Sequence, residues 1–166
     1  GDDLMDYSEN SDGRPPIGQL CDVYEETGCG AVALIEVPKG QEHLYGIVTG
    51  TKDENGHLVI DELVEKPAPG TAPSQYAIVG RYILPEDIWE LLERTEPGHN
   101  GEIQLTDALT GLAKGRGLRG VFVDATRYDA GDKLGYLHAN ICYALKRPQL
   151  RDGLLEILRT VVKNHS

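Results

Sequence analysis

Two aspartates stand where the edge of a sheet could present them to a bound ion. Asp2 follows a glycine at the predicted end of a strand, and Asp129 begins a short turn between a predicted strand and a predicted helix. Sheets of α/β proteins bind ligands at strand ends, and two carboxylates there suit a divalent cation that bridges phosphates. The chain has 27 acidic residues, so spacing alone leaves a solvated acidic surface as the alternative.

The sequence Glu65-Lys66-Pro67 places a carboxylate and a cation at another predicted strand end. The residue before a proline favours extended backbone, so Lys66 is predicted to be extended and held in a fixed direction. Its ammonium suits a phosphate oxygen, and Glu65, on the opposite pleat, could accept hydrogen bonds from sugar hydroxyls. A surface ion pair at the end of a strand is the alternative interpretation.

Glycines interrupt two predicted strands, at Gly46 and at Gly80. A glycine inside a strand lowers stability and often marks the close approach of a ligand or of another backbone. A bulge, or packing against a bulky neighbour, would explain both positions equally well. The five histidines show no metal-ligand spacing, so they are interpreted as surface or helix residues.

Apolar patterning predicts helices and strands in alternation around these positions. Strands are expected over residues 31–37, 45–48, 57–60, 63–66, 76–84 and 120–124. Helices are expected over residues 17–27, from Pro85 onward with Trp89 on the buried face, and over 105–114, 132–146 and 149–163. Residues 5–16 are predicted to form a loop. The alternation indicates an α/β protein with a mixed, mainly parallel sheet flanked by helices.

The composition of the chain limits the binding partners and the cellular compartment that we expect for it. With 16 Lys and Arg against 27 Asp and Glu, the formal net charge is −11, which disfavours nucleic acid and anionic membranes as partners. No apolar run approaches the roughly 18 residues that cross a bilayer. The three cysteines have neither disulfide nor metal spacing, and the start has no secretory pattern, so a cytoplasmic location is expected.

Taken in order, several short motifs make the interpretation more specific. Together they resemble bacterial UTP–glucose-1-phosphate uridylyltransferases of the sugar nucleotidyltransferase superfamily, from residue 1 to about residue 150. The motifs are Gly1-Asp2-Asp3-Leu4, Asp22-Val23-Tyr24-Glu25-Glu26-Thr27-Gly28, Tyr45-Gly46-Ile47-Val48, Val64-Glu65-Lys66-Pro67, Val79-Gly80-Arg81-Tyr82, Gly101-Glu102-Ile103-Gln104-Leu105-Thr106-Asp107, Tyr128-Asp129-Ala130-Gly131-Asp132-Lys133-Leu134-Gly135-Tyr136 and Ala144-Leu145-Lys146-Arg147-Pro148.

The resemblance implies a Rossmann-like nucleotidyltransferase fold and a Mg²⁺-dependent reaction of UTP with glucose 1-phosphate that gives UDP-glucose and pyrophosphate. It implies that Asp2, with Asp3 as its alternate, and Asp129 bind the metal. By the same resemblance, Lys66 contacts the sugar phosphate and Glu65 contacts the glucose hydroxyls. The remaining substrate contacts that it implies are Gly46, Val79 and Gly80.

The resemblance also has gaps. The family's Gly-rich G-x-G-T-R loop, whose backbone amides cradle the triphosphate, does not occur in this sequence. The chain is therefore interpreted as the C-terminal half of such an enzyme, expected to bind UTP poorly and to be inactive alone. Ala130 stands where relatives often have Cys, and Asp132 where Ser or Thr is common; Asp132 is expected to cap the following helix, with weaker substrate binding as the alternative.

Residues 1–148 are assigned to the sugar- and metal-binding part of the nucleotidyltransferase domain. Residues 149–166 are assigned to a C-terminal helix that could mediate self-association, and a homo-oligomer is expected. Two alternatives stay open at this point. The chain could belong to a non-catalytic regulatory paralogue or oligomerisation module, or to a nucleotidyltransferase that uses another nucleoside triphosphate.

Overall fold

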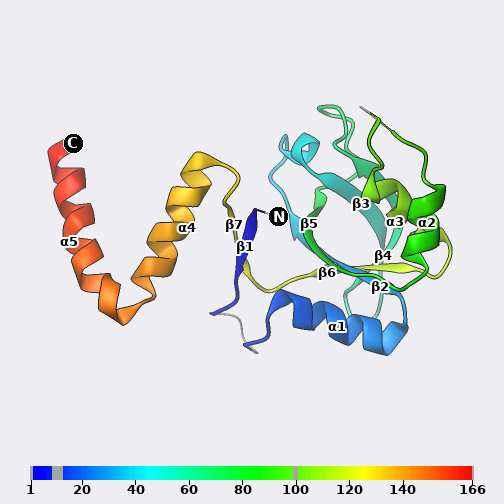
Figure 1. Ribbon diagram of the computed structural model, residues 1–166, viewed down its shortest axis with the longest axis horizontal. Coiled ribbons are helices and arrows are strands. Elements are labelled where there is room, and N and C mark those ends of the chain that lie inside the picture. The colour runs from blue at the N-terminus through cyan, green and yellow to red at the C-terminus, as the bar shows by residue number, and fades with distance from the viewer. Residues whose placement is uncertain (1, 9–12, 99–100, 166) are drawn as a thin grey trace. The chain divides into compact units, whose positions relative to one another are not determined.

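The computed structural model describes residues 2–8, 13–98 and 101–165 and divides the chain into two compact units (Figure 1). The first, here called the sheet unit, is Tyr7–Ala125. The second, here called the ribbon unit, consists of Gly1–Asp6 and Thr126–Ser166. The sheet unit is thus inserted in sequence between the two segments of the ribbon unit.

Five strands of the sheet unit form a sheet that closes on itself in the order β2-β5-β3-β4-β6. Their bounds are Gly30–Glu36 (β2), Gly46–Lys52 (β3), Leu58–Glu65 (β4), Tyr76–Ile83 (β5) and Leu118–Phe122 (β6). The first of these reads GAVALIE and is buried along most of its length, as expected for a strand covered on both faces.

The predicted mixed α/β architecture is confirmed, but the prediction that the sheet is mainly parallel is wrong. Among the strand pairings of the described residues, only β2 with β6 is parallel. Strands β3 and β4 are joined by the short turn that contains Asp53 and Gly56, and a tight connection can only bring the second strand back antiparallel. Alternation of strands with helices was therefore a poor guide to strand direction here.

Helices belong to the sheet unit as well, in the part of the chain that the structure describes. They are α1 (Pro16–Thr27), η1 (Glu42–Leu44), α2 (Ile88–Arg94) and α3 (Leu105–Lys114). The first begins on a proline and ends where Gly28 takes a φ of 65° and donates its N–H to the carbonyl of Tyr24 at 2.8 Å, the usual signals for a helix start and stop. Helix α1 packs on β2 and β5, and α3 packs on β4.

The main core lies between the strands and the helices α2 and α3. It is built from buried aliphatic side chains: Val32, Leu34, Val48, Leu58, Ile60, Leu63, Ile78, Ile88, Ala108, Leu109, Leu112 and Leu118. Burial of these side chains holds the start of α3 against the end of β4, and this junction carries part of the site described below.

One helix starts later than predicted. The chain turns at Glu86 and Asp87, and α2 begins at Ile88 instead of Pro85. Ile88 is buried, but Trp89 is 68% exposed, so the prediction that Trp89 lies on the buried face is wrong. Ile88, Leu91 and Leu92 are buried or half-buried and have the i, i+3, i+4 spacing of one helix face, and Trp89, about 100° around the helix from Ile88, falls outside that face.

The ribbon unit combines two short strands with two helices. Strand β1 (Asp3–Asp6) pairs antiparallel with β7 (Thr126–Asp129), and Asp3 lies opposite Asp129. Helix α4 (Lys133–Leu145) packs on β7 and contacts α5 (Pro148–His165). Residues 5 and 6 were predicted to be loop; their strand is only four residues long, and its partner lies far away in the sequence, so local patterning could not reveal it.

The predicted cap of α4 is confirmed, because the Asp132 carboxylate accepts a hydrogen bond from the Gly135 N–H at 2.8 Å. Helix α5 buries none of its described residues, and Ile157, Val161 and Val162 are exposed. Self-association through residues 149–166 stays a prediction. In the part of the chain that the structure describes, no helix combines the length and apolar character that spanning a bilayer requires.

Candidate functional site

The first group of candidate residues meets at one end of the sheet unit, where β3 starts and β4 ends. Gly46 is the first residue of β3 and lies opposite Glu65, the last residue of β4. The hydroxyl of Thr106, in the first turn of α3, donates a hydrogen bond to Oε2 of Glu65 at 2.6 Å. Such a short bond is typical of a donor to an ionised carboxylate. The Glu65 side chain is therefore held by a neighbouring helix.

Gly46 gives this carboxylate its space. A Cβ atom placed at Gly46 would lie 3.0 Å from Oε2 of Glu65 and 3.8 Å from Oγ1 of Thr106. The first distance is shorter than carbon and oxygen ordinarily approach, so a side chain at Gly46 would press on the carboxylate. Of the explanations that the sequence left open for Gly46, close packing beside Glu65 is supported, and contact with a sugar stays a prediction.

Lys66 does not have the backbone conformation predicted from the following proline. Its φ is 43°, and it is the one non-glycine residue with positive φ in the described part of the chain, so the prediction of extended backbone is wrong. Its N–H donates to the carbonyl of Tyr45 at 3.0 Å, a bond that continues the β3–β4 ladder by one residue and turns the chain at its end. A lysine in this region is strained, and strain of this kind concentrates at functional sites.

Strand β5 contributes the last two candidates of this group. Val79 is almost completely buried, so its side chain belongs to the core and only its backbone could face a ligand. Gly80 is exposed, with a φ of 43° and open space where a Cβ would stand. Any larger residue there would be strained by its backbone and not by its neighbours.

The second group lies in the ribbon unit, where the structure brings Asp2 and Asp129 together. Asp2 immediately precedes β1, instead of following a strand as predicted, and Asp129 is the last residue of β7. Both side chains converge on Gly131: a Cβ placed there would contact Oδ2 of Asp2 and lie 3.3 Å from Oδ1 of Asp129. The Ala130 N–H also donates to the Asp2 carbonyl at 2.8 Å. Gly131 therefore leaves room for two neighbouring carboxylates.

An arginine compensates the negative charge of this group. Arg127 donates from Nε to Oδ1 of Asp3 at 2.6 Å and from Nη2 to Oδ2 of Asp129 at 3.1 Å. The other oxygen of Asp129, Oδ1, accepts the Gly131 N–H at 3.1 Å. Arg127 thus engages the carboxylates of Asp3 and Asp129 alike, and Asp3 as the alternate metal ligand stays a prediction.

The donor set at Gly131 fits Mg²⁺. Carboxylate oxygens are the ligands this ion prefers, and it commonly binds one or two carboxylates and completes its shell with water and substrate phosphates. Asp2 and Asp129 supply two such carboxylates. Within residues 2–8, 13–98 and 101–165, no group of three His, Cys, Asp or Glu side chains is arranged to hold a metal ion, so the further ligands would have to come from phosphate or water.

Buried polar contacts anchor the β1–β7 ribbon to α4. The side chain of Asp6 is buried and receives a hydrogen bond from Nζ of Lys146 at 2.6 Å. Tyr128, on the neighbouring strand, packs edge-on against His138. Burial, followed by a hydrogen bond with Cys142, raises the pKa of Tyr128 to about 12 because the ionised phenolate would be poorly solvated there. The ribbon that carries the two aspartates is therefore fixed to its own helix.

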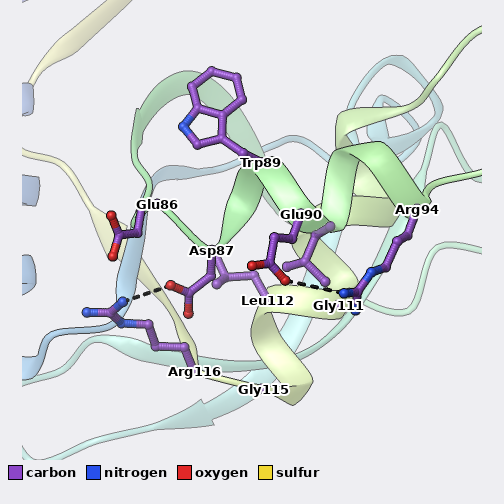
Figure 2. A pocket seen from close by; sticks show the side chains of 10 residues that line it. Glu86, Asp87, Trp89, Glu90, Arg94, Gly111, Leu112, Gly115 and Arg116 are labelled. Carbon is purple, nitrogen blue, oxygen red and sulfur yellow. Dashed lines mark hydrogen bonds and ion pairs between the residues drawn. The ribbon is translucent and has the colours of Figure 1, made fainter.

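A pocket of about 540 Å³ lies elsewhere in the sheet unit, between α2 and α3 (Figure 2). Ion pairs between Arg116 and Asp87, and between Arg94 and Glu90, lie along it, and Trp89 stands beside it. Its lining includes none of the predicted site residues. The candidate site is thus not this pocket but the end of the β3–β4 ladder and, in the ribbon unit, the turn at Gly131.

Comparison with known proteins now assigns the family. A sequence model described as "Nucleotidyl transferase" matches residues 11–144, which is most of the chain. The chain belongs to the nucleotidyl transferase family. The resemblance predicted from the ordered motifs is confirmed at this level.

Individual relatives of this nucleotidyl transferase are also informative. Over 159 residues the chain is 42% identical to a UTP–glucose-1-phosphate uridylyltransferase of Staphylococcus haemolyticus, covering 96% of this chain and 54% of the relative. A crystal structure of UDP-glucose pyrophosphorylase complexed with UDP-glucose matches with a TM-score of 0.80 and 38% identity, over 88% of this chain and 54% of that one. The UTP-bound UGPase of Acinetobacter baumannii matches with a TM-score of 0.78 and 31% identity, over 97% and 53%. The chain spans about half the length of the curated relatives it matches.

Three residues that help to build the site were not singled out by sequence reasoning. Thr106 was quoted only as part of a motif, Arg127 directly precedes another motif, and Gly131 lies inside it. Spacing could have drawn attention to Arg127, because side chains two residues apart share one face of a strand. Nothing local to Thr106 indicates Glu65 as its partner, since that contact joins a helix to a distant strand.

Proposed function

We propose that this chain forms the sugar- and metal-binding part of a Mg²⁺-dependent UTP–glucose-1-phosphate uridylyltransferase. In the reaction, an oxygen of the phosphate of glucose 1-phosphate bonds to the α-phosphorus of UTP, and the bond from that phosphorus to pyrophosphate breaks. The carboxylate of Glu65, held at the end of β4 by Thr106, is the single observation that supports a sugar site best. The names of relatives at 38–42% identity support the choice of substrates.

The proposed chemistry needs no protein nucleophile. A sugar phosphate is largely dianionic at neutral pH, since its second pKa is about 6, and it can attack without a strong base. What the chain has to supply is orientation of two anions that repel one another and neutralisation of their charge. Lys66 is proposed to bind the sugar phosphate as a point charge, and Glu65 to orient the sugar through its hydroxyls.

Asp2 and Asp129 are proposed to hold Mg²⁺ beside Gly131. When bound, the ion would neutralise phosphate charge and orient the phosphates. Gly46 and Gly80 are proposed to leave room for the sugar, together with the backbone at Val79. The partners proposed are UTP, glucose 1-phosphate and UDP-glucose. A second copy of the chain is proposed to bind through the exposed apolar residues of α5, and a cytoplasmic location agrees with three free cysteines.

The proposal can be tested by replacing the matched 159-residue segment of the S. haemolyticus relative with this chain. The chimera is expected to form UDP-glucose from UTP and glucose 1-phosphate when Mg²⁺ is present, and the 166-residue chain alone is expected to form none. The reaction is monitored by measuring the pyrophosphate that is released. A folded chimera that turns over dTTP or ATP in preference to UTP would favour a nucleotidyltransferase with another substrate.

Substitution of Lys66 by alanine in the chimera provides the matched control. If Lys66 binds the phosphate in the transition state, kcat/KM should fall at least about a hundredfold with the fold unchanged. A chimera that folds and binds UDP-glucose yet shows no turnover with any nucleotide would instead favour the non-catalytic alternative.

A further inference from the structure

We infer that Thr106 is a positioning residue that sets which oxygen of Glu65 is available to a sugar hydroxyl. The inference rests on the proposed sugar site and adds a residue to it. It starts from the position of Thr106 in the first turn of α3, where its side chain is directed at a strand and not at its own helix.

Thr106 is the second residue of α3, so the helix offers its hydroxyl no carbonyl four residues earlier, and the hydroxyl bonds a different element. Threonine hydroxyls inside helices commonly bond the carbonyl four residues earlier, as Thr110 does with the carbonyl of Thr106 at 2.9 Å. Thr106 instead donates to Oε2 of Glu65 at 2.6 Å across 41 positions of sequence. Thr106 is nearly buried, with 9% of its surface exposed, whereas Glu65 is exposed, so protein covers the donor side of the bond while the carboxylate stays accessible to a ligand.

A hydroxyl has a single proton, so Thr106 can donate a hydrogen bond to only one of the two oxygens of Glu65. The hydroxyl donates to Oε2, and a Cβ at Gly46 would approach the same atom to 3.0 Å. Oε2 thus accepts from Thr106 and lies on the side of the carboxylate that faces the Gly46 backbone. The second oxygen, Oε1, keeps its lone pairs for hydrogen bonds from a ligand, and the carboxylate cannot rotate freely to lose that orientation.

This arrangement has a consequence for specificity. A carboxylate fixed at one oxygen presents the other at a defined height and angle, so it can accept from one sugar hydroxyl and not from its epimer. A freely rotating glutamate would accept from the hydroxyl of either epimer, and it would lose side-chain conformational entropy on binding. Thr106 is therefore expected to act on sugar affinity and selectivity through Glu65, without touching the substrate.

The test measures binding of α-D-glucose 1-phosphate and its monodeoxy analogues to the 166-residue chain by nuclear magnetic resonance titration with Mg²⁺ present. Thr106→Val keeps the shape and removes the donor, and it should weaken glucose 1-phosphate binding about five- to tenfold. Thr106→Ser restores the donor and should bind within about twofold of wild type. Thr110→Val removes a hydroxyl from the same helix that bonds only its own backbone, and it should also bind within about twofold.

The analogues identify the hydroxyl that Glu65 accepts. For the analogue that lacks this hydroxyl, wild type and Thr106→Val should bind equally, because nothing is left for the positioned oxygen to accept. A purely structural role would weaken all analogues alike, and that result would overturn the inference. So would unchanged binding by Thr106→Val, or a Thr106→Ser variant as weak as Thr106→Val.

A second substitution guards against misfolding of the valine variant. Thr106→Ala removes the same hydroxyl without adding a second methyl group, and it should cause the same selective loss. If Thr106→Ala folds and binds every analogue as wild type does, the inference fails even when Thr106→Val cannot be studied. Failure of the proposed function gives a different result, because the wild-type chain would then bind glucose 1-phosphate no better than inorganic phosphate.

Discussion

Glu65 in the sheet unit and Asp129 in the ribbon unit are both carboxylates at strand ends, yet their surroundings differ in charge. Glu65 is held by a neutral hydroxyl, from Thr106. Asp129 is held by a guanidinium, from Arg127, and by a backbone N–H. A neutral donor fixes the geometry of a carboxylate without neutralising it, whereas a cation removes much of its charge.

The difference agrees with the two tasks proposed for these groups. A carboxylate that accepts sugar hydroxyls needs its full negative charge and one fixed direction. Two carboxylates that share a metal ion must first tolerate each other, and a nearby cation reduces their repulsion until the ion binds. The comparison therefore predicts that the ribbon unit depends on charge compensation for its stability and that the Glu65 end of the sheet does not.

The largest effect is expected from removal of Arg127. Arg127→Ala leaves Asp3 and Asp129 without their shared cation. The loss matters because the side chains of Arg127 and Asp3 are only 17% and 16% exposed, so water replaces the missing partner poorly. We expect a loss of about 2 kcal/mol in the free energy of unfolding, less than for a fully buried pair because Asp129 is partly solvated. Urea denaturation measures this loss.

Adding Mg²⁺ to the Arg127 variants tests the proposed metal site. If the ion binds the carboxylates beside Gly131, millimolar Mg²⁺ should raise the melting temperature more in Arg127→Ala than in the wild type, because it takes over the compensation. Arg127→Lys keeps the charge but cannot make both directed contacts, so its loss should be intermediate. Equal responses to Mg²⁺ in all three proteins would contradict a metal site at this position.

A smaller effect, of the opposite sign, is expected at Lys66. Lys66→Gly removes the strain of a side chain at a φ of 43° and should raise the free energy of unfolding by about 1 kcal/mol. Lys66→Ala keeps a Cβ and thus the strain, so its stability should stay close to wild type. Both variants should lose affinity for glucose 1-phosphate. A glycine variant less stable than the alanine variant would show that the backbone is not strained.

The smallest effect concerns Tyr128, which anchors the ribbon. Its pKa of about 12 in the folded protein lies above its ordinary value of 10.0, so below pH 10 it is neutral in both states and its contribution is complete. As the pH rises above 10, the unfolded state ionises first, and the free energy of unfolding should fall. Tyr128→Phe should show a shallower fall between pH 10 and pH 11. Identical pH slopes would indicate that the ring is solvated.

The helices and turns were predicted from the sequence more reliably than the way in which the strands pair. The helix ending at Gly28 and the turn at Gly56 carry local signals, and both are where they were expected. The direction of the strands was mispredicted because pairing depends on contacts between distant segments. The conformation of Lys66 was mispredicted for a related reason: the tertiary bond from its N–H to Tyr45 overrides the local preference before Pro67.

For the site, residue types were predictable and their partners were not. The pairing of Gly46 with Glu65 follows from a register that no local pattern specifies. The engagement of Asp3 by Arg127 likewise required the β1–β7 pairing, which places Asp3 opposite Asp129.

The β1–β7 ribbon also constrains the order in which the chain can fold. Arg127 and Asp3 are 124 positions apart in sequence, and closing so long a loop is slow and entropically costly unless the intervening chain is already compact. The sheet unit supplies that compaction, since Tyr7–Ala125 makes up nearly all of the interval. The two aspartates beside Gly131 should consequently come together late in folding, so a chain with a misfolded sheet unit would also lack the carboxylate pair proposed to bind metal.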